Sequence, residues 1–429
     1  MNRNSLKITI NRPDKQSVGI FLWLNLNLLL AIARYILTRA GFETGMVREA
    51  VLFMTTCIPF AYLIISQGGA KKKTLPSWLV TFLGLYVSIV LVFLISLIFN
   101  PVLKNFYFRK SYGIGNVFSL DGAIFAFLFF AMFDDSTKLR NAMTKSAYVM
   151  FFYLLVVVFL PAFRQGYWLD IAPGGGTMKF SYSLSFGYDM MFPFTVFFTI
   201  ALKSHKPIHY ALALFSAILI ITNGGRGSTV VLAMFFMLLI IISIIDGKTS
   251  PVKKFFLVSS IIVVGIILIA FGEELLALLI SILKSHNINS RSIETLLNGS
   301  FSDSNGRELI WKTVIEAIRK GGLFGYGLFG DRPFVAPIHV AGYSHNLFLE
   351  LLVSFGIVGA FVIVCIIVDA VKMIIFCKDE DWRIIYVILF TCSCKLMLSL
   401  SLWYAWEFWA AAAVAYKYRI LKKRNLLLT

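Results

Sequence analysis

The sequence predicts an all-α, polytopic membrane protein, and three observations support this fold class. Of the 429 residues, 59% are hydrophobic and only 14% are charged, whereas roughly a quarter of the residues in a soluble domain are charged. The mean hydropathy is +0.81. Apolar runs of about 18 residues or more, long enough to cross a bilayer as a helix, recur along nearly the whole chain. We therefore expect one integral membrane domain over 1–429.

The apolar runs predict about twelve membrane-spanning helices. The first run follows a polar and basic N-terminal segment that has no small-residue cleavage site after the run. We interpret it as a retained helix rather than a removed signal. The expected spans are 18–38, 49–66, 77–99, 116–133, 145–163, 190–203, 208–222, 228–246, 254–273, 345–376, 384–401 and 404–419.

Basic residues in short loops predict the orientation of the chain. Lysine and arginine gather in segments such as 71–73, 248–254 and 417–425, which the order of the spans places on one side. Short loops rich in these residues stay in the cytoplasm, so we expect both termini to be cytoplasmic. The basic residues behind the formal net charge of +18 then fix the orientation of the chain in the membrane. We therefore expect no nucleic-acid partner.

Two segments on the opposite side are expected to shape an outer cavity. One is 164–190, which is rich in glycine and aromatic residues, and the other is the large outer loop 274–344. Within this loop, 304–322 predicts an amphipathic helix with Asn305 as its N-cap and two glycines at its end. Its predicted apolar face, which we expect to lie on the outer membrane boundary, contains Ile310, Trp311, Val314, Ile315 and Ile318.

Arg226, Arg307 and His345 are far apart in the sequence, but the predicted topology places all three on the outer side. Each has an ordinary explanation, because arginines anchor helix ends to headgroups and a histidine at a helix end forms interfacial hydrogen bonds. Together they suit a diphosphate at the lipid boundary. Guanidinium groups bind phosphate oxygens bidentately, and an imidazole takes up a proton near neutral pH.

The sequence gives no sign of a cofactor. The outer segments hold no obvious carboxylate cluster for Mg²⁺, so we expect a metal-independent reaction in which arginines stabilise the phosphate leaving group. The five cysteines lie within or at the ends of apolar runs, which fits neither a disulfide framework nor a zinc site. A nucleotide-driven pump is not expected, because the chain has no Walker motif.

Three motifs in order resemble the O-antigen ligase and polymerase superfamily. They are NGGRGS, GRELIWKTVIEAIRKGGLFGYGLFG and SHNLFLELLVSFGIVGAF, within 222–360. These relatives are bacterial membrane glycosyltransferases that use undecaprenyl-diphosphate-linked sugars. The resemblance implies a site on the periplasmic or extracellular face of the cytoplasmic (inner) membrane. It implies that Arg226 and Arg307 bind the lipid diphosphate, that His345 assists the acceptor hydroxyl or contacts the leaving group, and that Asn346 holds the imidazole.

The superfamily has two activities that these motifs do not separate. A polymerase joins lipid-linked oligosaccharide repeat units into an O-antigen or capsular polysaccharide, commonly beside a chain-length regulator protein. A ligase moves the finished glycan onto lipid A-core. Richness in Lys, Phe and Ile favours the polymerase. A flippase for the lipid-linked glycan is the alternative from another class, but the sequence shows no internal repeat and its candidate charges cluster on one face.

Weaker candidates lie outside this set. Glu350 and Lys395 fall inside predicted spans and could form a structural ion pair. Tyr167 and Trp168 could line an acceptor groove.

Overall fold

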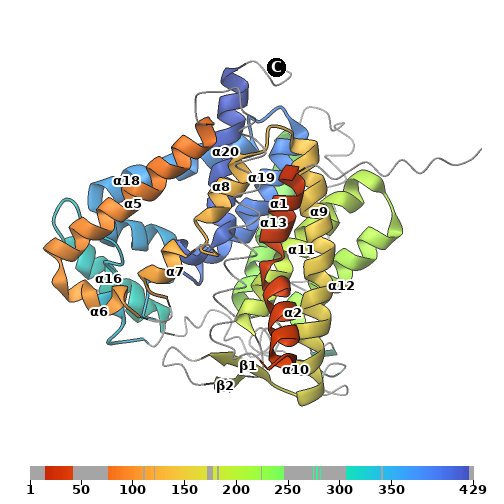
Figure 1. Cartoon of the computed structure of the whole chain (residues 1–429), viewed down its shortest axis with the longest axis horizontal. Coiled ribbons are helices and arrows are strands. Elements are labelled where there is room, and N and C mark those ends of the chain that lie inside the picture. The colour runs from red at the N-terminus through yellow and green to blue at the C-terminus, as the bar shows by residue number, and fades with distance from the viewer. Residues whose placement is uncertain are drawn as a thin grey trace, which may run out of the picture.

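The computed structural model describes most of the chain. The described residues are 15–41, 76–109, 112–119, 121–171, 177–180, 183–223, 225–245, 306–339 and 342–424, with 274, 277, 278 and 281. The predicted spans 49–66 and 254–273 and much of the outer loop lie outside them. The prediction of Asn305 as an N-cap is wrong, because the helix that begins at Arg307 has Gly306 as its N-cap. What is described is a helical bundle with one short β-hairpin (Figure 1).

Five helices of the described part are long and apolar enough to cross a membrane. The helices α1 (Lys15–Leu24) and α2 (Leu26–Arg39) form a bent pair, which makes a sixth span if the two helices cross the membrane together. Each corresponds to a predicted span, which confirms a multi-pass membrane protein. The count of about twelve stays a prediction. The five are α5 (Ser77–Phe99), the run Ser136–Gln165 formed by α9 (Ser136–Tyr153), a π-helical stretch and α10 (Leu160–Gln165), α11 (Leu184–Ser204), α13 (Arg226–Ile245) and α18 (Leu347–Ile374).

The predicted span 116–133 is wrong as a continuous helix. It is divided into α7 (Ile114–Phe118) and α8 (Phe125–Ala131), with a turn between them. A side chain at Gly122 in this turn would clash with the carbonyl oxygen of Ser119, at 2.7 Å. Every residue of α8 is buried, and α8 packs on α20 (Trp406–Lys423). Its apolar run therefore reflects a place at the centre of the bundle rather than contact with lipid.

The predicted spans 384–401 and 404–419 have different boundaries in the structure. The chain forms α19 (Glu380–Ser393), which ends well before residue 401, and continues into α20 through short 3₁₀ turns. This irregular stretch includes Leu400, whose φ is +62°. Backbone outside a helix is tolerated at membrane depth only when protein groups satisfy its polar atoms, and a buried carboxylate does so here.

The hairpin of β1 (Trp168–Ile171) and β2 (Thr177–Phe180) follows α10. It lies at the end of the molecule opposite the C-terminus of α20 (Figure 1). Trp168 is buried, and its ring lies 4.9 Å from that of Phe186. The expectation that Trp168 lines an acceptor groove is therefore not supported, because its ring belongs to the core.

The predicted amphipathic helix is present as α16 (Arg307–Lys320), but its apolar face packs on protein. Ile310, Val314 and Ala317 form a cluster with Val335 of α17 (Arg332–Val335) and Val353 of α18. Ile315, which we placed on this face, is exposed. The expectation that this apolar face is free to lie on lipid is corrected, since α18 and α17 cover its buried stripe. The place of α16 at the membrane boundary stays a prediction.

A break in α18 fixes the loop that follows α16. Gly356 has φ +53° and ψ −124°, which is not helical. At the break, the carbonyl of Val353 accepts from the Tyr326 amide at 3.0 Å, and the amide of Ile357 donates to the Leu323 carbonyl at 2.9 Å. The unwound turn thus passes its backbone hydrogen bonds to residues 323–327, which holds this loop against α18.

Gly356→Ala should destabilise the protein, because a methyl group there would come 2.1 Å from the Leu323 carbonyl oxygen in a backbone conformation that favours glycine. We expect a loss of about 2 kcal/mol or more, measured as a lower midpoint of thermal unfolding in detergent. Gly84→Ala in α5 is the control, since a methyl group there meets open space and should stabilise the helix by up to ~1 kcal/mol. Equal midpoints for the two variants would contradict the strain at Gly356.

Candidate functional site

His345 lies at the N-terminal end of α18, directly before the N-cap of that helix. Asn346 is the N-cap, and its side-chain oxygen accepts from the amides of Phe348 and Leu349 at 3.0 and 3.2 Å. This cap satisfies helix amides that have no intrahelical partner. Asn346 therefore has a structural role that fixes where α18 begins. It does not hold the imidazole through a hydrogen bond, because neither ring nitrogen of His345 has a partner among the described residues.

His345 is held in a constrained and largely buried position. Its φ is +52°, in the left-handed region, and it is 9% exposed. The ring of Tyr343 lies 4.3 Å away and that of His339 lies 5.4 Å away. Within the described part of the chain, neither ring nitrogen of His345 has a hydrogen-bond partner. Two unsatisfied nitrogens at a buried position are unusual and leave both available to a bound molecule.

Arg307, the first residue of α16, lies close to His345. Burial is the largest cause that lowers the pKa of His345, and together with the charges of Arg307, His339 and Arg332 it brings this pKa to about 3. The pKa of His339 is also lowered, by burial and by Arg307. His345 is therefore a neutral imidazole at pH 7 with a permanent guanidinium charge near it. The structure brings these two predicted residues together.

The residue after Arg226 packs against Tyr188, which interacts with residues around His345. Arg226 begins α13, and the next residue, Gly227, packs against Tyr188 of α11 so closely that a methyl group on it would lie 2.0 Å from the Tyr188 hydroxyl oxygen. Tyr188 in turn interacts electrostatically with Arg307 and Tyr343. Its hydroxyl is buried and has no hydrogen-bond partner among the residues described. Tyr188 thus lies between the turn of Arg226 and the residues around His345.

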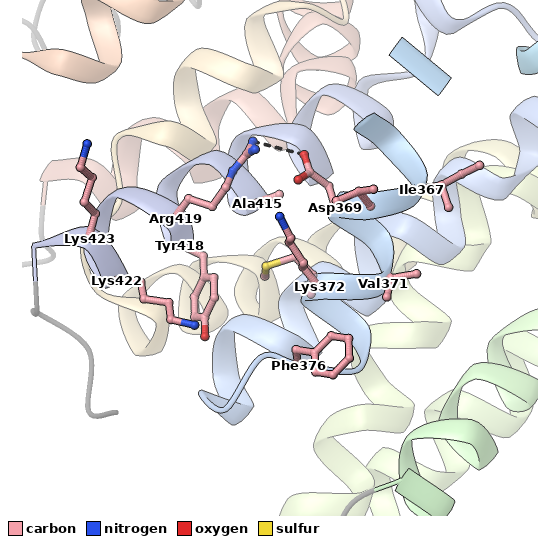
Figure 2. Close-up of a pocket in the computed structure, with 12 residues that line it drawn as sticks. Ile367, Asp369, Val371, Lys372, Phe376, Ala415, Tyr418, Arg419, Lys422 and Lys423 are labelled. Carbon is pink, nitrogen blue, oxygen red and sulfur yellow. Dashed lines mark ion pairs between the residues drawn. The ribbon is translucent and has the colours of Figure 1, made fainter. Parts of the chain in front are cut away.

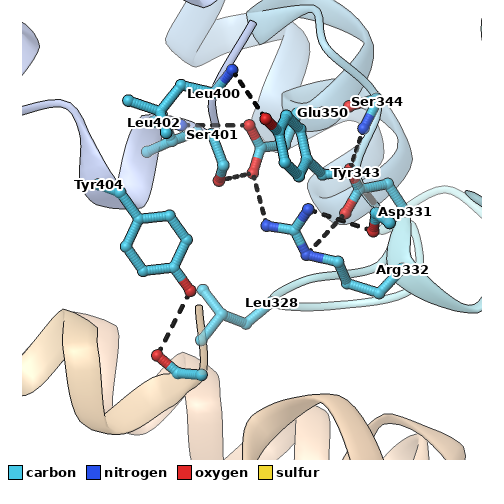
Figure 3. A network of polar contacts seen from close by, with 12 residues as sticks. Leu328, Asp331, Arg332, Tyr343, Ser344, Glu350, Leu400, Ser401, Leu402 and Tyr404 are labelled. Carbon is cyan, nitrogen blue, oxygen red and sulfur yellow. Dashed lines mark hydrogen bonds and ion pairs between the residues drawn. The ribbon is translucent and has the colours of Figure 1, made fainter. Parts of the chain in front are cut away.

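A buried polar network supports the loop that carries His345 (Figure 3). Arg332 is 4% exposed and lies 3.7 Å from Asp331 and 3.9 Å from Glu350. Its guanidinium also donates to the Gly342 carbonyl at 3.3 Å and lies 5.1 Å from the centre of the Tyr343 ring. The carboxylate of Asp331 accepts from the Ser344 amide at 2.7 Å. Residues 342–344 are therefore tied to α17 directly before His345.

Glu350 connects the network to the irregular stretch after α19. Its carboxylate accepts from the Ser401 hydroxyl and, at 3.2 Å, from the Leu402 amide. The expected ion pair between Glu350 and Lys395 is wrong. Lys395 pairs instead with Glu407 at 2.8 Å, because the chain between α19 and α20 brings residues 401 and 402 to Glu350.

Comparisons with known proteins agree with the sequence motifs. Residues 211–364 match the family model described as O-antigen ligase. The match confirms the resemblance to this superfamily over the matched residues. It includes Arg226, Arg307, His345 and Asn346, and the family consists of glycosyltransferase-like membrane enzymes. No curated protein and no solved structure matches the chain.

Sequence reasoning missed several residues of this candidate site. Tyr188, Arg332 and Tyr343 belong to the group around His345, as does His339. Only His339 had a usable signal, since it precedes His345 by six positions in one loop. Tyr188 looks like an ordinary aromatic residue of an apolar helix, and Arg332 looks like a surface charge in a long loop.

Arg332→Met should destabilise the protein, because it leaves the buried carboxylates of Asp331 and Glu350 without their cation. Breaking a buried ion pair in this way typically costs about 3–5 kcal/mol, and the midpoint of thermal unfolding should fall accordingly. Arg319→Met is the control, because Arg319 is exposed on α16 and its loss should change stability by less than about 0.5 kcal/mol. If the two variants have the same midpoint of thermal unfolding, the network does not hold this loop.

Proposed function

We propose that the protein is a membrane glycosyltransferase that moves a glycan from a lipid-linked diphosphate to an acceptor hydroxyl. The observation that supports this most directly is the neutral, unpaired imidazole of His345 beside the permanent charge of Arg307. An anion-binding group and a proton acceptor then lie within one site. The match to a family of glycosyltransferase-like enzymes supports the same reaction class.

In the proposed reaction the acceptor oxygen bonds to the anomeric carbon while the bond from that carbon to the diphosphate breaks. Arg307 and Arg226 contact the diphosphate oxygens, where negative charge develops as the leaving group departs. His345 takes the proton of the acceptor hydroxyl. The alternative role, a contact from His345 to the diphosphate, uses the same geometry and differs in where the proton goes.

The base role requires that substrate binding change the imidazole. A base works best when its pKa lies near the working pH, and the pKa of His345 is about 3 in the structure. A bound diphosphate would offset the positive charges of Arg307 and Arg332 that contribute to this low value. We infer that the donor raises the pKa of His345 as it binds.

An apolar cavity supports a lipid-linked donor. It has a volume of about 450 Å³ and lies among α13, α18, α19 and α20. Leu347 and Phe348 line it, and they directly follow Asn346 in α18. A hydrocarbon chain in this cavity would keep its diphosphate at the end of α18 that carries His345. Undecaprenyl diphosphate, the carrier implied by the resemblance, has both a hydrocarbon chain and a diphosphate.

Two acceptors fit this donor chemistry. As a polymerase, the protein would add the glycan to another lipid-linked repeat unit, with a chain-length regulator as a possible partner. As a ligase, it would add the glycan to lipid A-core, and the description of the matched family model favours this candidate. In both cases we place the site on the outer face of the bacterial cytoplasmic membrane, following the positive-inside pattern.

His345→Ala and Arg307→Ala should each abolish glycan transfer, while Arg226→Lys should be poorly tolerated, because a point charge does not reproduce a bidentate fork. The assay supplies purified protein with lipid-linked repeat units or lipid A-core and measures extended glycan and released undecaprenyl diphosphate. Lys312→Ala is the matched control, because Lys312 is exposed on α16 and should retain full activity. Near-normal transfer by the His345 and Arg307 variants would contradict the assignment, and translocation without bond formation would favour a flippase.

The affinity for undecaprenyl diphosphate should depend on pH through His345. Since donor binding raises the low pKa of this imidazole, binding takes up a proton and strengthens as pH falls from about 7.5 to about 5.5, by roughly tenfold per unit at most. The diphosphate titrates as well, so the slope is compared with that of His345→Gln. The wild type should show the steeper slope, and equal slopes would show that His345 takes up no proton on binding.

A further inference from the structure

A second cleft lies between the C-terminal parts of α18 and α20. It has a volume of about 700 Å³ (Figure 2). In Figure 1 the end of α20 lies at the opposite end of the molecule from the β-hairpin. His345 precedes the first residue of α18, whereas the cleft is lined by residues 367–376 at the other end of that helix. The cleft therefore lies at the opposite end of α18 from His345. It adjoins the apolar cavity proposed for the donor chain, with which it shares Ile367, Asp369, Val371 and Ala415 as wall residues.

The walls of the cleft have an excess of positive charge. Arg419 of α20 forms an ion pair with Asp369 of α18 at 3.2 Å (Figure 2). Three further lysines line the cleft, namely Lys372 from α18 with Lys422 and Lys423 from α20. None of the three is in an ion pair that the described residues form. With the pair neutralised, three positive charges remain to attract an anion.

The same cleft presents apolar side chains that the protein does not cover. Ile367 and Val371 are 48% and 39% exposed, and Phe376 is 66% exposed. Ile367 and Val371 lie one helical turn apart in α18, with Phe376 just beyond its end, so they form a strip that leads toward the lysines. Apolar area beside a basic rim matches a molecule with an anionic head and a hydrocarbon tail.

We propose that this cleft binds an anionic phospholipid. The phosphate lies among Lys372, Lys422 and Lys423, and an acyl chain lies along Ile367, Val371 and Phe376. Lysines near a helix C-terminus also favour the helix dipole and cytoplasmic retention. Those two effects apply to all three lysines, because Lys372 lies in the last turn of α18. They do not explain why lysines of two helices border one cleft beside an exposed apolar strip. The lipid accounts for all of these features and does not depend on the proposed catalytic function.

The test titrates purified, delipidated full-length protein in neutral detergent with dioleoyl-phosphatidylglycerol and measures retained lipid by native mass spectrometry. The triple variant Lys372→Gln, Lys422→Gln and Lys423→Gln should lose phosphatidylglycerol affinity by at least about tenfold, since each basic residue near an anionic headgroup contributes severalfold. Dioleoyl-phosphatidylcholine, which has no net charge, should bind more weakly than phosphatidylglycerol to the wild type and equally to both proteins.

Two controls separate this site from general charge and from free anions. The matched variant Lys138→Gln, Lys145→Gln and Lys206→Gln removes three exposed lysines outside the cleft and should retain wild-type affinity. Phe376→Ser should weaken phosphatidylglycerol binding without changing the charge. The proposal is overturned if both triple variants bind alike, if phosphatidylcholine binds the wild type as tightly, or if inorganic phosphate displaces phosphatidylglycerol at equal concentration, because the cleft would then be a free-anion site.

Discussion

The buried charge of Arg332, shared with Asp331 and Glu350, is the interaction on which the arrangement of the site depends. A guanidinium that is taken out of water is tolerated only when carboxylates, carbonyls and aromatic faces surround it. Here those groups come from α17, from residues 342–344 and from α18, while Glu350 also holds residues 401 and 402. One cation therefore joins three segments, and the loop leading to His345 is one of them.

The break in α18 at Gly356 also helps to position the site, because it holds the loop that follows α16. A transmembrane helix normally satisfies its own backbone, so an unwound turn must find partners elsewhere. The partners are in residues 323–327, which follow α16. Through this exchange α18 holds both the loop and α16, whose first residue is Arg307. The break and the buried arginine together set where Arg307 and His345 lie relative to each other.

The two ligand sites that we propose lie at opposite ends of α18. At the N-terminal end, a neutral imidazole lies in the field of fixed guanidinium charge with its nitrogens unpaired. At the C-terminal end, lysines border an open apolar cleft. In the first region the ligand is expected to change the protonation of the protein. In the second region the lysines are solvated, and only the sum of their charges matters.

The sequence by itself determined the membrane class and the existence of the longest apolar helices in the described part of the chain, because these follow from hydrophobic length. It also selected Arg226, Arg307 and His345 as candidates, from charged and titratable groups at predicted helix ends, and their roles stay a prediction. Only the tertiary structure decided that α8 is a core helix, that α16 packs on α18, and that Lys395 pairs with Glu407 rather than with Glu350. Apolar runs look the same whether lipid or protein covers them. The partner of a buried charge depends on how the chain turns between helices, as residues 394–405 show.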